Sequence, residues 1–199
     1  MNDPFERLFS NFIKMPGASE EDASRACRAL NFIPPSDYLS ALHFSNGGEG
    51  FIQHCYFRLY STEQLLSLNQ AYQVTRFAPG LVIFGSNGSG EAFGFDARQS
   101  PMEIVRIPFI PLDFEYAEPM GQTFVEFLQA LEQADQGRGS PKIDRRRIGK
   151  EVHEIQPIVF GGSPTDAKNK ALVPLEQHAE LAVFWNSNYQ NQKGSKESR

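Results

Sequence analysis

The chain has 199 residues, 40% of them hydrophobic, and a formal net charge of −5, which allows one domain with a sizeable core and at most a small appendage. No run of residues approaches the roughly 18 consecutive apolar residues that a membrane span needs, and residues 1–4 lack the basic and apolar regions of a signal peptide. The two cysteines, Cys27 and Cys55, form no metal-spaced pair, so we expect a cytoplasmic protein with structural thiols and no membrane partner.

Three short helices are predicted before residue 48. The first starts at Pro4 and keeps an apolar face as far as Phe12. The second begins at Ser19, and the Pro34-Pro35 pair stops it. The third starts at about Ser36 and ends at an Asn-Gly-Gly sequence, whose glycines supply the left-handed conformation of a C-cap.

The segment 51–60 is predicted to form one or two strands. Phe57 and Arg58 lie there at alternating positions, so their side chains are expected on opposite faces of a sheet. Ser61 and Gln64 then form a capping box, which predicts a helix with its apolar residues at helical spacing.

The segment Ile83–Asp96 is predicted to be a β-hairpin, with Asn87-Gly88 as its turn. Its glycines lead into a second strand and not into a helix N-terminus, so a phosphate-binding loop is not expected. Glu103–Pro108 adds a further strand to the same antiparallel sheet. A capping box of Thr123 and Glu126 starts the clearest helix of the chain, after which the first domain ends.

Charge is divided unevenly along the chain. Residues 1–135 carry 8 Lys and Arg against 17 Asp and Glu, a net −9, and residues 136–199 carry 11 against 7, a net +4. Because phosphate contacts require basic groups, we do not expect the first region to bind nucleic acid. It could attract a basic protein, although an acidic surface also serves solubility alone.

Several motifs of the first region occur in a fixed order. They are Ile33-Pro34-Pro35, the Asn46-Gly47-Gly48 end of the third helix, Leu59–Leu65, the Phe-Gly-Ser-Asn-Gly hairpin with its Phe-Asp, and Thr123–Leu128. In this order they resemble the SUKH superfamily of bacterial toxin-immunity proteins, whose fungal relatives regulate cell-wall glucan synthesis, over roughly residues 20–132. The resemblance implies an α+β fold with helices packed against an antiparallel sheet, no catalysis, no cofactor, and a cognate protein toxin as the partner. Many such toxins are nucleases or deaminases.

The family motifs hold the fold and do not mark a partner surface, so exposed acids are the candidates. Acidic and aromatic side chains interleave in the loop-like stretch 111–120: Asp113, Phe114, Glu115, Tyr116 and Glu118. Such a surface suits a basic partner. The alternative is a solvated loop that packs its aromatic side chains inward.

Residues 135–147 are predicted to be a linker, because 135–141 are rich in turn formers and 144–147 form a charge run without apolar period. We expect a solvated connector, although Arg145 to Arg147 could touch phosphates, which leaves nucleic acid as a partner for the basic tail. We divide the chain into a SUKH-like domain at 1–134, this linker, a C-terminal module at 148–190, and a frayed tail at 191–199.

The C-terminal module has a signature of its own: His153, Pro157, Gly161-Gly162, Asn169, His178, and a helical stretch from Ala179 to Trp185. It resembles the HNH, or ββα-metal, motif of colicin-type nucleases, and predicts a small ββα appendage. By that resemblance His153 and His178 match metal ligands and Asn169 matches the loop-orienting asparagine. Glu154 stands where the family's general-base histidine is expected, and Ala182 stands where its third metal ligand is expected.

These departures weaken the predicted chemistry. A catalytic divalent site normally needs three protein ligands and an open position, with a base within reach of the bound water. We therefore favour a degenerate module that serves packing or partner binding. The alternatives are histidines without a functional role, and a metal-dependent HNH-like nuclease in which Glu154 acts as base or ligand and the first domain is regulatory. A divalent metal is expected only under that last alternative.

Overall fold

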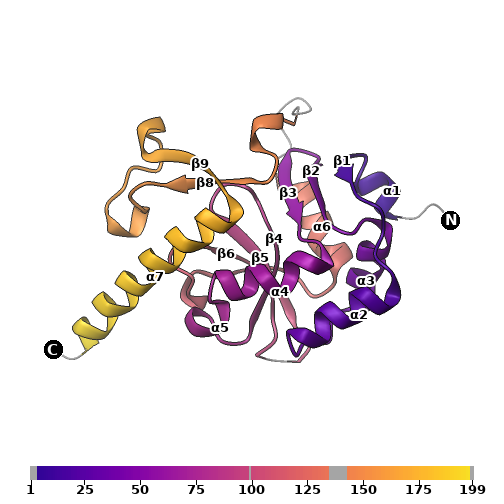
Figure 1. The fold of residues 1–199 in the computed structure, drawn as a ribbon, viewed down its shortest axis with the longest axis horizontal. Coiled ribbons are helices and arrows are strands. Elements are labelled where there is room, and N and C mark those ends of the chain that lie inside the picture. The colour runs from indigo at the N-terminus through magenta and orange to yellow at the C-terminus, as the bar shows by residue number, and fades with distance from the viewer. Residues whose placement is uncertain (1–3, 99, 135–142, 198–199) are drawn as a thin grey trace.

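A computed structural model describes residues 4–98, 100–134 and 143–197 (Figure 1). Residues 135–142 of the predicted linker and residues 198 and 199 of the predicted tail lie outside these ranges. Two parts follow one another along the chain: a large unit of sheet and helices up to residue 134, and a C-terminal segment from residue 143.

Seven strands of the described chain form one antiparallel sheet in which each strand pairs with its neighbours in sequence. They are β1 (Asn11–Lys14), β2 (Gly48–Ile52), β3 (Cys55–Leu59), β4 (Leu81–Ser86), β5 (Glu91–Asp96), β6 (Glu103–Pro108) and β7 (Glu118–Gly121). The helices of this unit are α1 (Pro4–Leu8), α2 (Glu20–Ala29), α3 (Ser36–Phe44), α4 (Thr62–Ala71), α5 (Val74–Phe77) and α6 (Phe124–Gln133). Helices and strands share one hydrophobic core cluster. The predicted α+β class with an antiparallel sheet is confirmed.

Aromatic side chains from both layers fill the core. Tyr38 of α3 packs edge-on against Phe124 of α6, with ring centroids 5.2 Å apart. Phe127 of α6 packs on Phe57 of β3 and on Phe84 of β4, both at 5.3 Å. All five rings are almost completely buried. Edge-to-face pairs of this kind stabilise a core beyond the effect of their buried area, by about 0.5–1.5 kcal/mol each.

The predicted hairpin is present as β4 and β5, with a register shift between Ile83 and Gly85. Its connection is longer than the expected two-residue turn. The Asn87 side-chain oxygen accepts hydrogen bonds from the backbone amides of Ser89 and Glu91, at 2.8 and 3.1 Å, and closes the loop. Gly88 adopts a φ of +64°, which favours glycine.

Two strands were not predicted. The first helix ends at Leu8, not near Phe12, because Phe12 lies in β1 opposite Gly50 of β2. A Cβ at Gly50 would lie 2.6 Å from the Phe12 Cα, so the glycine permits this close pairing. Likewise the stretch expected to be loop-like contains a 3-10 turn, η1 (Phe114–Tyr116), followed by β7.

The C-terminal segment contains a separate two-stranded sheet and a long helix. Its elements are η2 (Arg145–Arg147), β8 (Lys150–Glu154), η3 (Ile158–Phe160), η4 (Ala167–Asn169), β9 (Lys170–Pro174) and α7 (Leu175–Glu197). Figure 1 shows α7 running obliquely past α4 and α5 to a C-terminus far from the N-terminus. In the described ranges no helix, α7 included, is both long and apolar enough to cross a membrane.

Helix α7 continues well past the point where composition predicts fraying. Asn186 explains the difference, because its side chain accepts a hydrogen bond from the Leu112 amide at 2.8 Å and donates one to the Phe109 carbonyl at 2.9 Å. About two turns further along the helix, the Lys193 ammonium group lies 2.7 Å from the Asp113 carboxylate. These contacts fasten the helix to the large unit, which a reading of local composition does not reveal.

Candidate functional site

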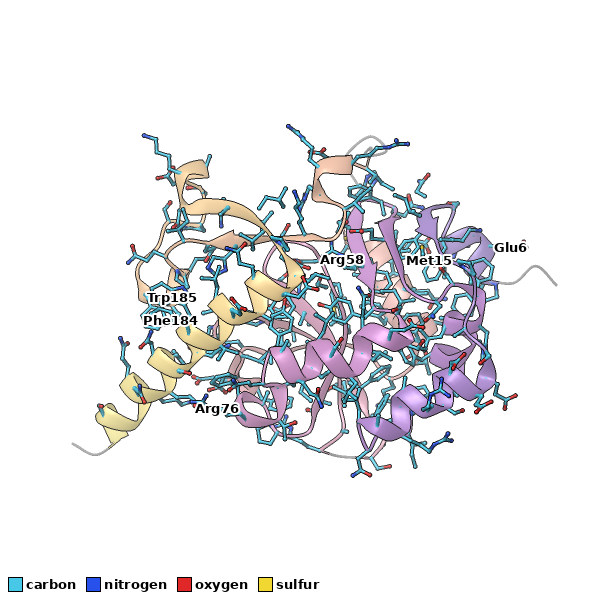
Figure 2. All side chains as sticks on the ribbon, viewed as in Figure 1. Glu6, Met15, Arg58, Arg76, Phe184 and Trp185 are labelled. Carbon is cyan, nitrogen blue, oxygen red and sulfur yellow. The ribbon has the colours of Figure 1, made fainter. Side chains whose placement is uncertain are left out.

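A buried ion cluster joins the large unit to the C-terminal segment. Alternation along β3 places the Arg58 side chain on the face opposite Phe57, as the sequence predicts. That face is not exposed to solvent, because the C-terminal segment covers it and leaves the Arg58 side chain 4% exposed. The guanidinium lies 2.6 Å from Glu49 of β2 and 2.6 Å from Glu151 of β8. Figure 2 shows Arg58 at the boundary between the strands and this segment.

The rest of the cluster supplies hydrogen-bond donors to the two carboxylates. The Tyr56 hydroxyl and the Gly149 amide donate to Glu49, the latter at 2.9 Å. The Ser86 hydroxyl donates to Glu151. Burial raises the pKa of the Glu151 carboxyl in spite of the neighbouring Arg58. One cation therefore holds two buried acids, and the cluster depends on every one of its members.

The hairpin loop provides a second attachment point for the C-terminal segment. The Gly88 carbonyl accepts a hydrogen bond from the Val152 amide of β8 at 3.2 Å and one from the Arg147 guanidinium at 2.8 Å. That guanidinium also lies 5.3 Å from the centre of the Tyr56 ring, a cation–π distance. Arg147 was predicted to lie in a solvated linker, but its contacts fix η2 to the large unit.

The structure brings His153 and His178 together at the same boundary. His153 is on β8 and His178 is in the first turn of α7, and their rings lie 5.4 Å apart at 80°. Both side chains are buried. His178 Nδ1 and the Tyr72 hydroxyl of α4 share a hydrogen bond of 2.7 Å. Burial, followed by the effects of His153 and Arg58, lowers the pKa of His178 to about 3. Burial also lowers the pKa of His153, and Glu154 opposes that shift. His178 is therefore neutral at physiological pH.

Asn169 closes the loop between β8 and β9. Its side-chain oxygen accepts a hydrogen bond from the Gln156 amide at 2.8 Å, and its amide nitrogen donates to the carbonyls of Gln156 and Ser163 at 2.8 and 3.0 Å. Gly162 passes so close that a Cβ there would lie 1.7 Å from the Gln156 carbonyl oxygen. Asn169 thus holds this loop in place through three hydrogen bonds.

Glu154 and Ala182 limit what this site can do chemically. The Glu154 carboxylate pairs with Lys170 and accepts a hydrogen bond from the Ile158 amide at 3.1 Å. Ala182 is fully buried on α7 and offers no ligand atom. Across the residues that the structure describes, no group of three or more His, Cys, Asp or Glu side chains is arranged to hold a metal ion.

The acidic and aromatic residues nominated as a partner surface mostly contact α7. Lys193 pairs with Asp113 and lies 3.3 Å from Glu115, and the Tyr116 hydroxyl lies 3.2 Å from that of Tyr189. Glu115 and Tyr116 nevertheless remain exposed. Their role in binding a partner stays a prediction.

The other two nominated residues have different neighbours. The Arg98 guanidinium stacks on the half-buried Phe114 ring, with 3.3 Å to the ring centre. Glu118 is exposed on β7 and pairs with Arg106 of β6, which also approaches Glu91 at 3.7 Å. Aromatic packing at Phe114 agrees with the alternative of an inward-packed loop, while Glu118 stays accessible to a partner.

Sequence reasoning missed Arg58, Glu49 and Glu151 as a unit. The one available signal was an arginine within an otherwise apolar strand, and its alternation with Phe57 indicated only that it lies on the opposite face of the sheet. Only the position of the C-terminal segment in the structure reveals that Glu151 pairs with Arg58.

The large unit is an α+β domain whose helices pack on an antiparallel sheet, to which a polar C-terminal segment is attached. The chain matches the family model of the SMI1 / KNR4 family (SUKH-1) over residues 17–130, more than half of its length, and it belongs to this family. The match runs from just before α2 to within α6. No protein with curated annotation matches the chain. Domains of this family are generally of the toxin-immunity type.

Proposed function

We propose that this chain is a non-enzymatic immunity protein that binds and neutralises a cognate protein toxin. The observation that carries the proposal is the family match over residues 17–130, which contains most of the helices and strands of the large unit. Two buried ionisable side chains that could take part in catalysis are instead engaged in structural contacts: Glu151 pairs with Arg58, and His178 shares a hydrogen bond with Tyr72. This arrangement favours a binding function over a catalytic one.

The charge of the large unit favours a basic toxin, such as a nuclease. Residues 1–135 have a net charge of −9. An acidic surface attracts a basic partner over long range and speeds its association. Nucleases carry basic surfaces because they bind phosphates. Glu115, Tyr116 and Glu118 are exposed and supply an acidic and aromatic surface for such a partner.

The test is co-expression with toxins encoded beside the gene for this chain. One of them should lose its toxicity and should bind the purified chain in a stable complex. Replacing both Glu115 and Tyr116 by alanine should weaken that complex at least about tenfold. The matched control, Glu21→Ala on exposed α2, should leave it unchanged. If no neighbouring toxin is neutralised or bound, the immunity function is refuted.

We also propose that the C-terminal segment is a degenerate HNH-like module retained for packing and partner binding. Three observations support this proposal: the order β8, β9, α7, the adjacency of His153 and His178, and the loop held by Asn169. Glu154 and Ala182 at the positions of the base and third ligand speak against catalysis, because two histidines alone hold a divalent metal weakly.

The alternative function is a metal-dependent HNH-like nuclease, which the adjacency of the two histidines favours. Calorimetry with Zn²⁺, Ni²⁺ and Mg²⁺, together with plasmid nicking, separates the two. Our proposal expects no stoichiometric binding and no cleavage. Tight metal binding, with nicking that His178→Ala abolishes, would establish the nuclease instead.

A further inference from the structure

A cavity of about 250 Å³ lies between the large unit and the C-terminal segment. Its walls come from the hairpin loop and Glu91 at the start of β5, from Phe109 just after β6, from the β8 residues His153 and Glu154, and from His178 of α7. This volume is below the 300–1,000 Å³ that is typical of sites for drug-sized ligands, and it suits a single long side chain. Neither part of the chain forms the cavity without the other.

His153 gives the first indication that the cavity has a ligand. Its side chain is 4% exposed, and its Nδ1 atom is buried without a hydrogen-bond partner among the described residues. Folded proteins rarely leave a buried polar atom unpaired, because its lost hydration is then not replaced by another hydrogen bond. The imidazole lines the cavity, so this wall contains a buried polar ring whose hydrogen bonding is incomplete.

The charge of the cavity gives the second indication. Two carboxylates line it, those of Glu91 and Glu154, and no Lys or Arg does so in the described part of the chain. Their cationic partners, Arg106 and Lys170, do not line the cavity. Burial raises the pKa of Glu91 in spite of Arg106, so the carboxylate is short of positive charge and a cation in the cavity would stabilise it.

We propose that this cavity binds one basic side chain, an arginine, of the partner protein. The proposal rests on the proposed function, because it names how the chain would engage that partner. Phe109, Val152 and Ile158 offer apolar surface for the methylene groups of the side chain. The carboxylates of Glu91 and Glu154 accept hydrogen bonds from the guanidinium group.

A metal ion explains the cavity less well, because the described residues contain no group of three suitable ligands. An arginine needs no fixed coordination geometry and uses apolar walls that a metal site does not require. The cavity also gives the C-terminal segment a role in recognition, because His153, Glu154 and His178 complete a wall that the large unit leaves open.

The full chain can be tested with small probes. N-acetyl-L-arginine methylamide is titrated while NMR follows the imidazole signals of the four histidines. We expect saturable shifts of His153 and His178 with a millimolar Kd, the range of about −4 kcal/mol that one side chain can supply. His43 and His54 do not line the cavity and should not shift. The citrulline analogue has the same shape without the charge and should bind at least about tenfold more weakly.

Matched variants locate the binding. Glu91→Gln should weaken binding of the arginine probe about fivefold or more, because a charge-assisted hydrogen bond is lost. Glu103 lies on the neighbouring strand β6 outside the cavity, so Glu103→Gln should not weaken binding of the probe. Equal binding of the arginine and citrulline probes, or no saturable shift with either, would overturn the proposal. So would stoichiometric Zn²⁺ binding at His153 and His178.

Toxin binding separates this proposal from the proposed function. If a toxin binds the wild-type chain and a Glu91→Gln, Glu154→Gln double variant equally well, the arginine site is refuted and the immunity function stands. If the arginine probe binds in the cavity and no toxin is neutralised, the cavity proposal stands and the immunity function is refuted.

Discussion

Residues 17–130 and residues 143–197 are held in place by different kinds of side chain. The first region buries aromatic rings from its own helices and strands, such as those of Tyr38, Phe84 and Phe124. The second region buries few large apolar groups but four polar ones, which are Glu151, His153, His178 and Asn186. Three of these residues, Glu151, His178 and Asn186, form an ion pair or a hydrogen bond with a residue of the first region.

This difference has an energetic consequence. Apolar packing is distributed over many contacts, so a core tolerates moderate changes at one position. A buried polar contact depends on two specific groups, and removal of one leaves the other buried and unpaired. We therefore expect single substitutions of these buried polar residues to weaken the attachment of the C-terminal segment strongly. The sequence of either region alone does not indicate which residues these are.

The largest effect is expected for Arg58→Met. This change leaves the buried carboxylates of Glu49 and Glu151 without their cation, and it should lower the free energy of unfolding by about 3–5 kcal/mol in urea titrations. Arg25→Met is the control, because Arg25 pairs with Asp22 on the exposed surface of α2. It should cost less than about 1 kcal/mol. Similar small losses for both variants would contradict the role given to the buried cluster.

The next largest effect is a loss of folding stability as the pH is lowered. His178 has a pKa lowered from 6.5 to about 3 in the folded chain, so the unfolded chain binds its proton first as the pH falls. Its contribution to stability is full above pH 6.5 and is lost as the pH falls toward 3, by about 2–3 kcal/mol at about pH 4.5. NMR titration of the His178 imidazole should show it almost entirely neutral from pH 6.5 down to about pH 4.5. His178→Gln should give a flatter stability profile, and an unchanged slope would refute the assignment.

A smaller effect is expected for Asn186→Ala. The change leaves the Leu112 amide and the Phe109 carbonyl without their side-chain partner, which should cost about 1–3 kcal/mol. Hydrogen exchange should accelerate in α7 while the core strands stay protected. Asn191→Ala on an exposed position of the same helix is the control. Equal exchange in both variants would show that Asn186 does not fasten the helix.

The smallest effect is expected for Lys193→Ala. Lys193 is largely solvated where it meets Asp113 and Glu115, so its loss should lower the melting temperature only slightly. Added salt should reduce the difference, because solvent screens an exposed pair. Lys193→Arg keeps the charge and should behave as the wild type. A destabilisation as large as that of Arg58→Met would mean that the contacts of Lys193 hold this end of α7 as firmly as the buried cluster holds β8.

The same contrast explains which parts of the fold were predictable. Local patterns identified the helices capped at Ser19, Ser61 and Thr123, because capping boxes and apolar periods are properties of adjacent residues. They missed β1 and β7, short edge strands whose pairing is decided by distant residues such as Gly50 opposite Phe12. Strand propensity alone does not reveal such pairings.

The candidate sites divide along the same line. The sequence signature selected His153, Asn169 and His178. In the structure the two histidines lie together at the boundary between the large unit and the C-terminal segment, and Asn169 lies in the loop between β8 and β9. It did not select Arg58 or Glu91, since the importance of each comes from groups far away in sequence. Length and composition could not reveal that the positively charged C-terminal segment covers the face of β3 that carries Arg58.

The sequential order of the sheet determines how this chain can assemble during synthesis. Each strand from β2 to β7 pairs with the strand made just before it, so the sheet can grow as the polypeptide leaves the ribosome. Arg58, Tyr72 and Phe109 are all translated before their partners in α7 and β8. The C-terminal segment therefore docks last, onto a surface that is already built.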